Sequence, residues 1–188
     1  MAQQWRYPLY PILNGAGTAV SGAVGPTSGL IGSNLPQLPP LDRPGGRLII
    51  EVQAEISWTT TGGNITFDLR YGTVGQAIGS KLVLAASSAL AVTTPAAWPC
   101  MIYWSGRFRS LSTGVSANGV IYGQGWIKLG SSLTAFAAAV PFPVTQALRT
   151  VSTFNTSVVN ELDIGITYST VTGTPSVTVT DFSAEYSG

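Results

Sequence analysis

The sequence predicts an all-β protein: an antiparallel β-sandwich of the jelly-roll type, preceded by an extended N-terminal arm. Three observations favour this fold. Apolar and polar residues alternate with a period of two in several separate segments, which is typical of half-buried strands. Turns rich in Gly, Thr and Ser separate these segments, and almost no segment has a helical period. An immunoglobulin-like sandwich is the alternative, although its Cys-Trp-Cys pattern is absent.

Residues 1–46 form the predicted arm, and residues 47–188 form the predicted sandwich domain. Gly and Pro interrupt the arm so often that no period persists, and its prolines favour an extended connector. The arm is more apolar than a typical disordered tail, so we expect it to dock on a neighbouring protein or on its own sandwich. The predicted anchors are Trp5, Tyr7, Tyr10, Ile12 and Leu13.

Residues 47–71 carry the clearest strand pattern in the chain. The apolar positions are Leu48, Ile50, Val52, Ala54, Ile56 and Trp58 in the first half, and Ile65, Phe67, Leu69 and Tyr71 in the second. The Thr-Thr-Gly-Gly-Asn sequence between the halves predicts a tight turn, so we expect a hairpin. Its polar side carries Glu51, Glu55, Asp68 and Arg70, and we expect this side to face water.

Further strands are expected along the rest of the domain. Residues 81–86 form a short apolar strand, and Trp98, Cys100, Ile102 and Trp104 share one parity and are expected to be buried. Residues 120–129 also alternate, and Gly123 and Gly125 within them indicate a bulge or a close neighbouring backbone. Residues 131–140 predict either the one helical piece or a strand, and a strand is expected around residues 148–154. Residues 161–186 predict a second hairpin.

Charge is unusually sparse. Only 9% of the residues are charged, against about 25% in typical soluble domains, and the net charge is +1. Either the surface is coated with Ser and Thr, or much of it is buried in an assembly. The near-neutral balance argues against a nucleic-acid partner. No run of about 18 apolar residues occurs, so no transmembrane helix and no membrane partner is expected.

The chain offers few groups for chemistry. It contains no His, which excludes His-containing triads and disfavours zinc, and its single Cys100 lies in an apolar run and is expected to be buried. Glu161, Asp163, Asp181 and Glu185 are candidates for a calcium site. Burying the apolar residues of both strands sends Asp163 and Asp181 to opposite faces, so no metal site is expected. We therefore expect neither an enzyme nor a cofactor.

One surface is a candidate for ligand or subunit contact. Tyr103, Tyr122 and Trp126 fall on or near the parity opposite the best-buried residues, together with Gln124 and Lys128. Such a surface is able to stack sugar rings, or it packs against the arm or another subunit. Arg107 and Arg109 flank Phe108, a pattern that suits a phosphate backbone or, more simply, an acidic neighbour.

The chain resembles small jelly-roll virion proteins of tailed bacteriophages, of the head-decoration, fibre and minor capsid types. The resemblance lies in the Gly/Pro-rich N-terminal arm, the FDLRYGTVG segment and the closing LDIGITYSTVTGTPSVTVTDFSAEY. It implies a structural, non-enzymatic component located in the virion. The expected function is that of a capsid decoration or cement protein, bound through its arm to the major capsid protein or another virion protein. It also implies a homo-oligomer, by analogy a trimer. A receptor- or carbohydrate-binding module of a fibre or tail is the alternative.

Overall fold

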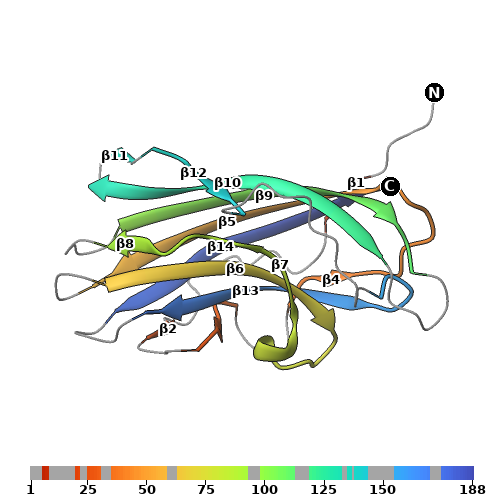
Figure 1. Cartoon of the computed structure of the whole chain (residues 1–188), viewed down its shortest axis with the longest axis horizontal. Helices are drawn as coiled ribbons and strands as arrows, with labels where there is room; N and C mark the ends of the chain where they lie inside the picture. Colours follow the sequence, from red (N-terminus) through yellow and green to blue (C-terminus); the bar gives the residue numbers. More distant parts are fainter. Residues whose placement is uncertain are drawn as a thin grey trace.

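The structure is a computed structural model in which two antiparallel β-sheets pack face to face (Figure 1). It describes residues 6–8, 20–21, 25–30, 35–58, 63–92, 98–112, 119–132, 135–136, 138–143, 155–169 and 175–188. Within these ranges the chain forms strands and one short 3₁₀ helix, η1 (Ile78–Ser80). No helix in the described ranges is long and apolar enough to cross a membrane. The predicted all-β sandwich is confirmed, and its jelly-roll connectivity stays a prediction.

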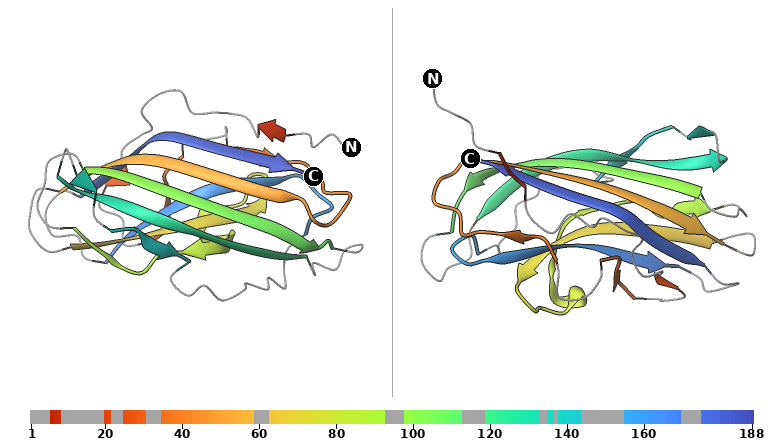
Figure 2. Two further views of the ribbon diagram at one scale, coloured as in Figure 1. Left: turned by 90° about the horizontal axis from the view of Figure 1, so that it is seen from above. Right: turned by 180° about the vertical axis from the view of Figure 1, so that it is seen from behind.

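Among the described residues, the larger sheet contains eight strands and the smaller sheet six. The main path of the larger sheet, in spatial order, is β1 (Arg6–Pro8), β14 (Ser176–Ser187), β5 (Arg47–Ser57), β9 (Trp98–Ser110), β10 (Val120–Ser132) and β11 (Ala135–Phe136). Two further short strands join it, β2 (Val20–Ser21) on β14 and β12 (Val140–Phe142) on β10. The four long strands lie side by side across the molecule, as the left view of Figure 2 shows.

The path of the smaller sheet is β3 (Thr27–Ser28), β13 (Asn160–Tyr168), β6 (Gly63–Thr73) and β7 (Leu82–Ala86). In addition, β4 (Gln37–Leu38) pairs with β13, and β8 (Leu90–Val92) pairs with β6. The predicted strand at residues 81–86 is therefore confirmed as β7.

Both predicted hairpins are wrong, because in each case the two strands belong to different sheets. Strand β5 pairs with β9 and β14 in the larger sheet, whereas β6 pairs with β13, β7 and β8 in the smaller one. The same division separates β13 from β14. Each pair is thus an arch across the sandwich. An arch turns two apolar strand faces toward each other, whereas a hairpin sets them side by side, and the alternating pattern is the same in both.

The two arches lie against each other and enclose the core. Leu48 is opposite Tyr186 and Ile56 is opposite Val177 in the larger sheet, while Leu69 is opposite Ile164 in the smaller one. An irregularity between Val179 and Asp181 shifts the register of β14. The buried parity consequently changes along β14, from Val177 and Val179 to Phe182, Ala184 and Tyr186.

The described parts of the N-terminal arm pack on the sandwich itself. Leu30, Leu35, Leu38 and Leu41 are buried in the core. The backbone is held by hydrogen bonds from Gly29 N to Ile164 O and from Leu162 N to Pro36 O, at 2.8 and 2.9 Å. Strands β1 and β2 extend the edge of β14, and β3 and β4 extend the edge of β13. The arm therefore covers backbone groups at one open side of both sheets.

Strands β9 and β10 confirm several expectations about the middle of the chain. Cys100, Ile102, Trp104 and Phe108 are buried, Trp98 is half-buried, and residues 107–109 are extended. Residues 135–136 and 140–142 are strands, so of the two alternatives for residues 131–140 the structure contains the strand. The strand expected around residues 148–154 lies outside the described residues.

The glycines of β10 allow the close approach that the sequence indicated. Gly123 lies opposite Gly106, and a Cβ atom at either position would overlap the indole ring of Trp104. A Cβ atom at Gly125 would overlap the carbonyl oxygen of Tyr103 on the neighbouring strand. The glycines at positions 106 and 123 thus leave room for the large indole ring of Trp104 within the larger sheet.

Substitution of Gly125 by Ala is expected to destabilise the fold by about 1–3 kcal/mol, because the clash is with backbone and requires β9 and β10 to separate. Gly79→Ala is the matched control, since a Cβ atom there meets nothing within 4 Å, and its effect should stay within about 0.5 kcal/mol. Urea unfolding of the two variants measures both. Equal stabilities would contradict the close approach.

The thiol of Cys100 is expected to be unreactive in the folded protein. Burial raises the pKa of Cys100 to about 12, so at pH 8 the group is the neutral thiol and not the reactive thiolate. A thiol-specific disulfide reagent should label the native protein slowly at pH 8 and the urea-unfolded protein at once. Fast native labelling would place Cys100 at the surface.

Candidate functional site

The outer face of the larger sheet brings together the aromatic and basic residues that the sequence singled out. Because Ile102, Trp104 and Phe108 point into the core, the alternate residues of β9 point outward. The register places Tyr122 opposite Arg107 and Trp126 opposite Tyr103. All five predicted surface residues, namely Tyr103, Tyr122, Trp126, Arg107 and Arg109, therefore share one face. We call this surface the β9–β10 face.

Ring contacts order the side chains of the β9–β10 face. Tyr103 and Trp126 are stacked, with ring centroids 5.8 Å apart and an interplanar angle of 21°. The guanidinium carbon of Arg109 lies 5.6 Å from the centroid of the Tyr122 ring. Lys128 Nζ lies 5.1 Å from the centroid of a Trp126 ring. At exposed sites such cation–π contacts contribute about 0.5–1 kcal/mol each, enough to hold the rings and cations in place.

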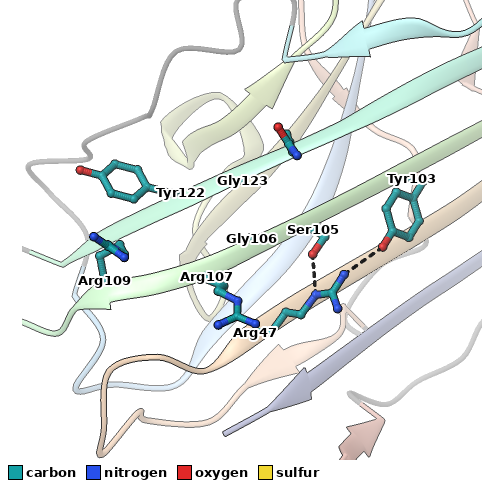
Figure 3. Close-up of a pocket in the computed structure, with 9 residues that line it drawn as sticks. Arg47, Tyr103, Ser105, Gly106, Arg107, Arg109, Tyr122 and Gly123 are labelled. Atoms are coloured by element: carbon teal, nitrogen blue, oxygen red, sulfur yellow. Dashed lines mark hydrogen bonds between the residues drawn. The ribbon is translucent and has the colours of Figure 1, made fainter.

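Arg47 is a further member of the face that sequence reasoning missed. It begins β5, opposite Arg107, and its Nε donates a hydrogen bond of 2.8 Å to Ser105 Oγ. Its Nη2 donates a bond of 3.3 Å to Tyr103 Oη, as Figure 3 shows. No local signal identified it, because the pairing of β5 with β9 joins residues far apart in the sequence.

These side chains surround a shallow hollow of about 520 Å³. Its lining is Arg47, Tyr103, Ser105, Gly106, Arg107, Arg109, Tyr122, Gly123 and Gln124 (Figure 3). Arg107, Arg109 and Gln124 are exposed, while the tyrosines are half-buried. The hollow therefore offers guanidinium donors, an amide and ring surface to a ligand, and its lining contains no acidic residue.

Charge is distributed unevenly over the outer face of the larger sheet, and β5 carries both signs, with Arg47 opposite Arg107 and Glu51 opposite Tyr103. Arg47, Arg107, Arg109 and Lys128 lie around the β9–β10 face. The acidic side chains Glu51, Glu55, Asp181 and Glu185 lie at outward positions of β5 and β14. A negatively charged ligand is thus favoured over β9 and β10 and disfavoured over β14.

The predicted arm anchors are placed differently. Tyr7 lies in β1, where its backbone is opposite Tyr186. Trp5, Tyr10, Ile12 and Leu13 lie outside the described residues. Contact between these five residues and a partner stays a prediction.

A second group of charged residues is buried on the outer side of the smaller sheet. Arg70 Nη2 donates a hydrogen bond of 2.9 Å to Asp68 Oδ2, and Arg70 Nη1 one of 2.8 Å to Ile78 O. Lys81 forms ion pairs with Glu161 and Asp163. Glu51 and Glu55 are exposed as expected, but the prediction that Asp68 and Arg70 face water is wrong. The arm and the segment around η1 cover this side of the sheet.

Burial also separates the four carboxylates that the sequence offered for calcium. Glu161 and Asp163 lie in β13, whereas Asp181 and Glu185 lie in β14 of the other sheet. Burial raises the pKa of Asp163, while hydrogen bonding from Ser28 and the charge of Lys81 act in the opposite direction. Across the described ranges, no group of three or more Cys, Asp or Glu side chains is placed to hold a metal ion.

No protein-family model matches the chain, and a search of curated proteins finds no relative.

Proposed function

We propose that the chain is a non-enzymatic binding protein of a virus particle, and that its β9–β10 face binds an acidic carbohydrate of the host surface. The observation that carries this proposal is the convergence of Arg47, Arg107 and Arg109 with Tyr103 and Tyr122 around one hollow. Guanidinium groups form paired hydrogen bonds with planar carboxylates and bind sulfates by charge. Aromatic rings offer flat apolar surface to the C–H face of a sugar.

The arrangement supports recognition of a charged, ring-containing chain and not of an isolated ion. The two exposed arginines supply charge to the hollow, and Tyr103 supplies ring surface that the neighbouring Trp126 extends beyond the hollow. Because these arginines are exposed to solvent, each ion pair contributes about 0.2–1 kcal/mol, and binding by one copy should be weak. A homo-oligomer, which we propose to be a trimer, would strengthen attachment by presenting several such faces together.

Acidic oligosaccharides should bind the protein more tightly than neutral ones, and binding should weaken as salt concentration rises. Replacing both Arg107 and Arg109 by Ala should reduce affinity at least tenfold, or by about 1.4 kcal/mol. Calorimetric titration with sulfated, uronic-acid-containing and neutral oligosaccharides of equal length measures this.

Arg43→Ala is the matched control, because Arg43 is exposed, pairs with Asp42 and does not line the hollow. Its affinity should equal that of the unchanged protein. Trp126→Ala should weaken the binding of all the oligosaccharides, acidic and neutral alike, because ring surface is lost. Binding of none of the acidic oligosaccharides, or equal binding by the double arginine variant, would count against the proposal.

The second candidate is the capsid decoration role that the resemblance implies. One observation favours it: β1 and β2, which belong to the predicted arm, both pair along the outer edge of β14. Apolar anchors there would bury surface against a capsid protein, and each large side chain contributes about 1.5–3 kcal/mol before ordering costs.

For this role, the variant with Trp5, Tyr10 and Leu13 all replaced by Ala should no longer sediment with virus particles that lack the protein. These changes leave β1 to β4 in place, whereas deleting residues 1–35 would also remove Ser28 and Leu30 from the fold. The Arg107/Arg109 double variant is the control and should still sediment with the particles. Unchanged co-sedimentation of the triple variant would rule out anchoring through the arm.

A further inference from the structure

Lys81 lies between two carboxylates beneath the covered side of the smaller sheet. Its Nζ atom is 3.2 Å from Asp163 Oδ2 and 3.3 Å from Glu161 Oε2. The side chains of Lys81, Glu161 and Asp163 are 1%, 6% and 2% exposed, so bulk water is excluded from all three. Glu161 and Asp163 are two residues apart in β13 and hence project from the same face of the strand.

The two oxygens of Asp163 have different partners. Oδ1 accepts hydrogen bonds from Ser28 Oγ at 2.6 Å and from Ile164 N at 2.8 Å, while Oδ2 faces the amine of Lys81. Two fixed donors at Oδ1 polarise the carboxyl carbon. They are also placed to stabilise negative charge on Oδ1 if that carbon becomes tetrahedral.

We propose that Lys81 and Asp163 condense spontaneously into an intramolecular isopeptide bond between Lys81 Nζ and Asp163 Cγ, with Glu161 as the proton acceptor. Lys81 Nζ already contacts an oxygen of each carboxylate in the folded chain, so no substrate has to be bound and ordered.

The reaction balances with one water molecule as the second product. A proton first passes from the Lys81 ammonium group to Oδ2 of Asp163, giving a neutral amine and a neutral acid. The amine attacks Cγ, Glu161 takes a proton from the nitrogen, and a C–N bond forms. The Cγ–Oδ2 bond then breaks as Glu161 returns that proton to the departing hydroxyl group. An amide and water result, and Glu161 is again a carboxylate.

The surroundings of Asp163 favour its neutral form. Burial raises the pKa of the Asp163 carboxyl group, in the direction of the protonated acid that the amine attacks. Converting a buried ion pair into a neutral amide also removes the cost of keeping two charges away from water. A hollow of about 400 Å³, whose lining includes Ser28 and the three reacting residues, offers the released water a way out.

Asp163, and not Glu161, is assigned as the carboxyl group that the amine attacks, because of the hydrogen-bond donors around it. Glu161 Oε2, the oxygen near Lys81, also accepts the 3.1 Å bond from Gly75 N, so this oxygen is held facing the amine as a proton acceptor. Asp163 instead receives two hydrogen bonds on Oδ1, the oxygen that is not paired with Lys81.

The proposed bond would tie together the two strands that flank β6. Lys81 immediately precedes β7 and Asp163 lies in the middle of β13, so the link would pass over β6 and join residues 82 positions apart. It would thereby close the smaller sheet covalently on its arm-covered side. This suits a protein that has to stay folded outside a cell, and it is independent of which ligand the β9–β10 face binds.

Intact-mass spectrometry of the denatured full-length protein tests the bond. The unchanged protein should be lighter than its sequence by one water molecule, after allowance for any removal of Met1. Proteolysis should release a branched peptide that joins Lys81 to Asp163. Glu161→Gln and Lys81→Arg should each restore the full mass, and Glu161→Gln should melt at a lower temperature.

Glu51→Gln supplies the matched control, since it makes the same chemical change at an exposed position of the other sheet and should keep the deficit of one water. A full-mass unchanged protein overturns the proposal, whether or not the variants fold. A branched peptide joining Lys81 to Glu161 overturns the assignment of Asp163 as the carboxyl group that is attacked. A remaining deficit in Glu161→Gln overturns the role of Glu161.

Discussion

The fold depends on the burial of single-sided apolar strands against each other across two arches. Strands β5 and β14 each bury one face, and they have to find another apolar face opposite. The β5–β6 and β13–β14 arches provide this, because each carries the chain from one sheet to the other. Each arch contributes one strand to each sheet, and the strands pair as β5 with β14 and β6 with β13. The two sheets are therefore built from the same two arches. Burial of the hydrophobic core therefore depends on the connections that carry the chain between the sheets.

The two outer faces differ because the described segments of the arm cover the smaller sheet. Leu30, Leu35 and Leu38 belong to the arm segments that run along β13. Strand β13 is buried along nearly its whole length on both faces. Polar side chains on that side had to be paired internally, and Asp68, Arg70, Lys81, Glu161 and Asp163 are. The outer face of the larger sheet carries no such cover among the described residues, and its charges and rings stay accessible. The cover thus explains why charged side chains are buried on one sheet and exposed on the other.

Sequence periodicity predicted the parity of the strands but not their partners. Alternation correctly placed Trp104 inside and Tyr103 and Trp126 on the opposite side, because parity is local. Pairing is not local: the same alternation serves a hairpin or an arch, so both hairpins were misassigned. The positions of Arg47 beside Ser105 and of Lys81 beside Asp163 depend on such long-range pairings. Asp68 and Arg70 were misplaced for a related reason, since nothing in their own strand signals that another segment covers it.

The distribution of charge bears on the low charge content that first suggested an assembly. The chain has nine basic and eight acidic residues, and five of these are hidden in the cluster around Lys81 and Arg70. Eight more lie on the outer face of the larger sheet, with acidic residues on β5 and β14 and basic residues on β5, β9 and β10. Exposed charge is therefore concentrated on one face of the sandwich. Since charged surfaces resist nonspecific association, this face is the one suited to a selective, salt-sensitive partner.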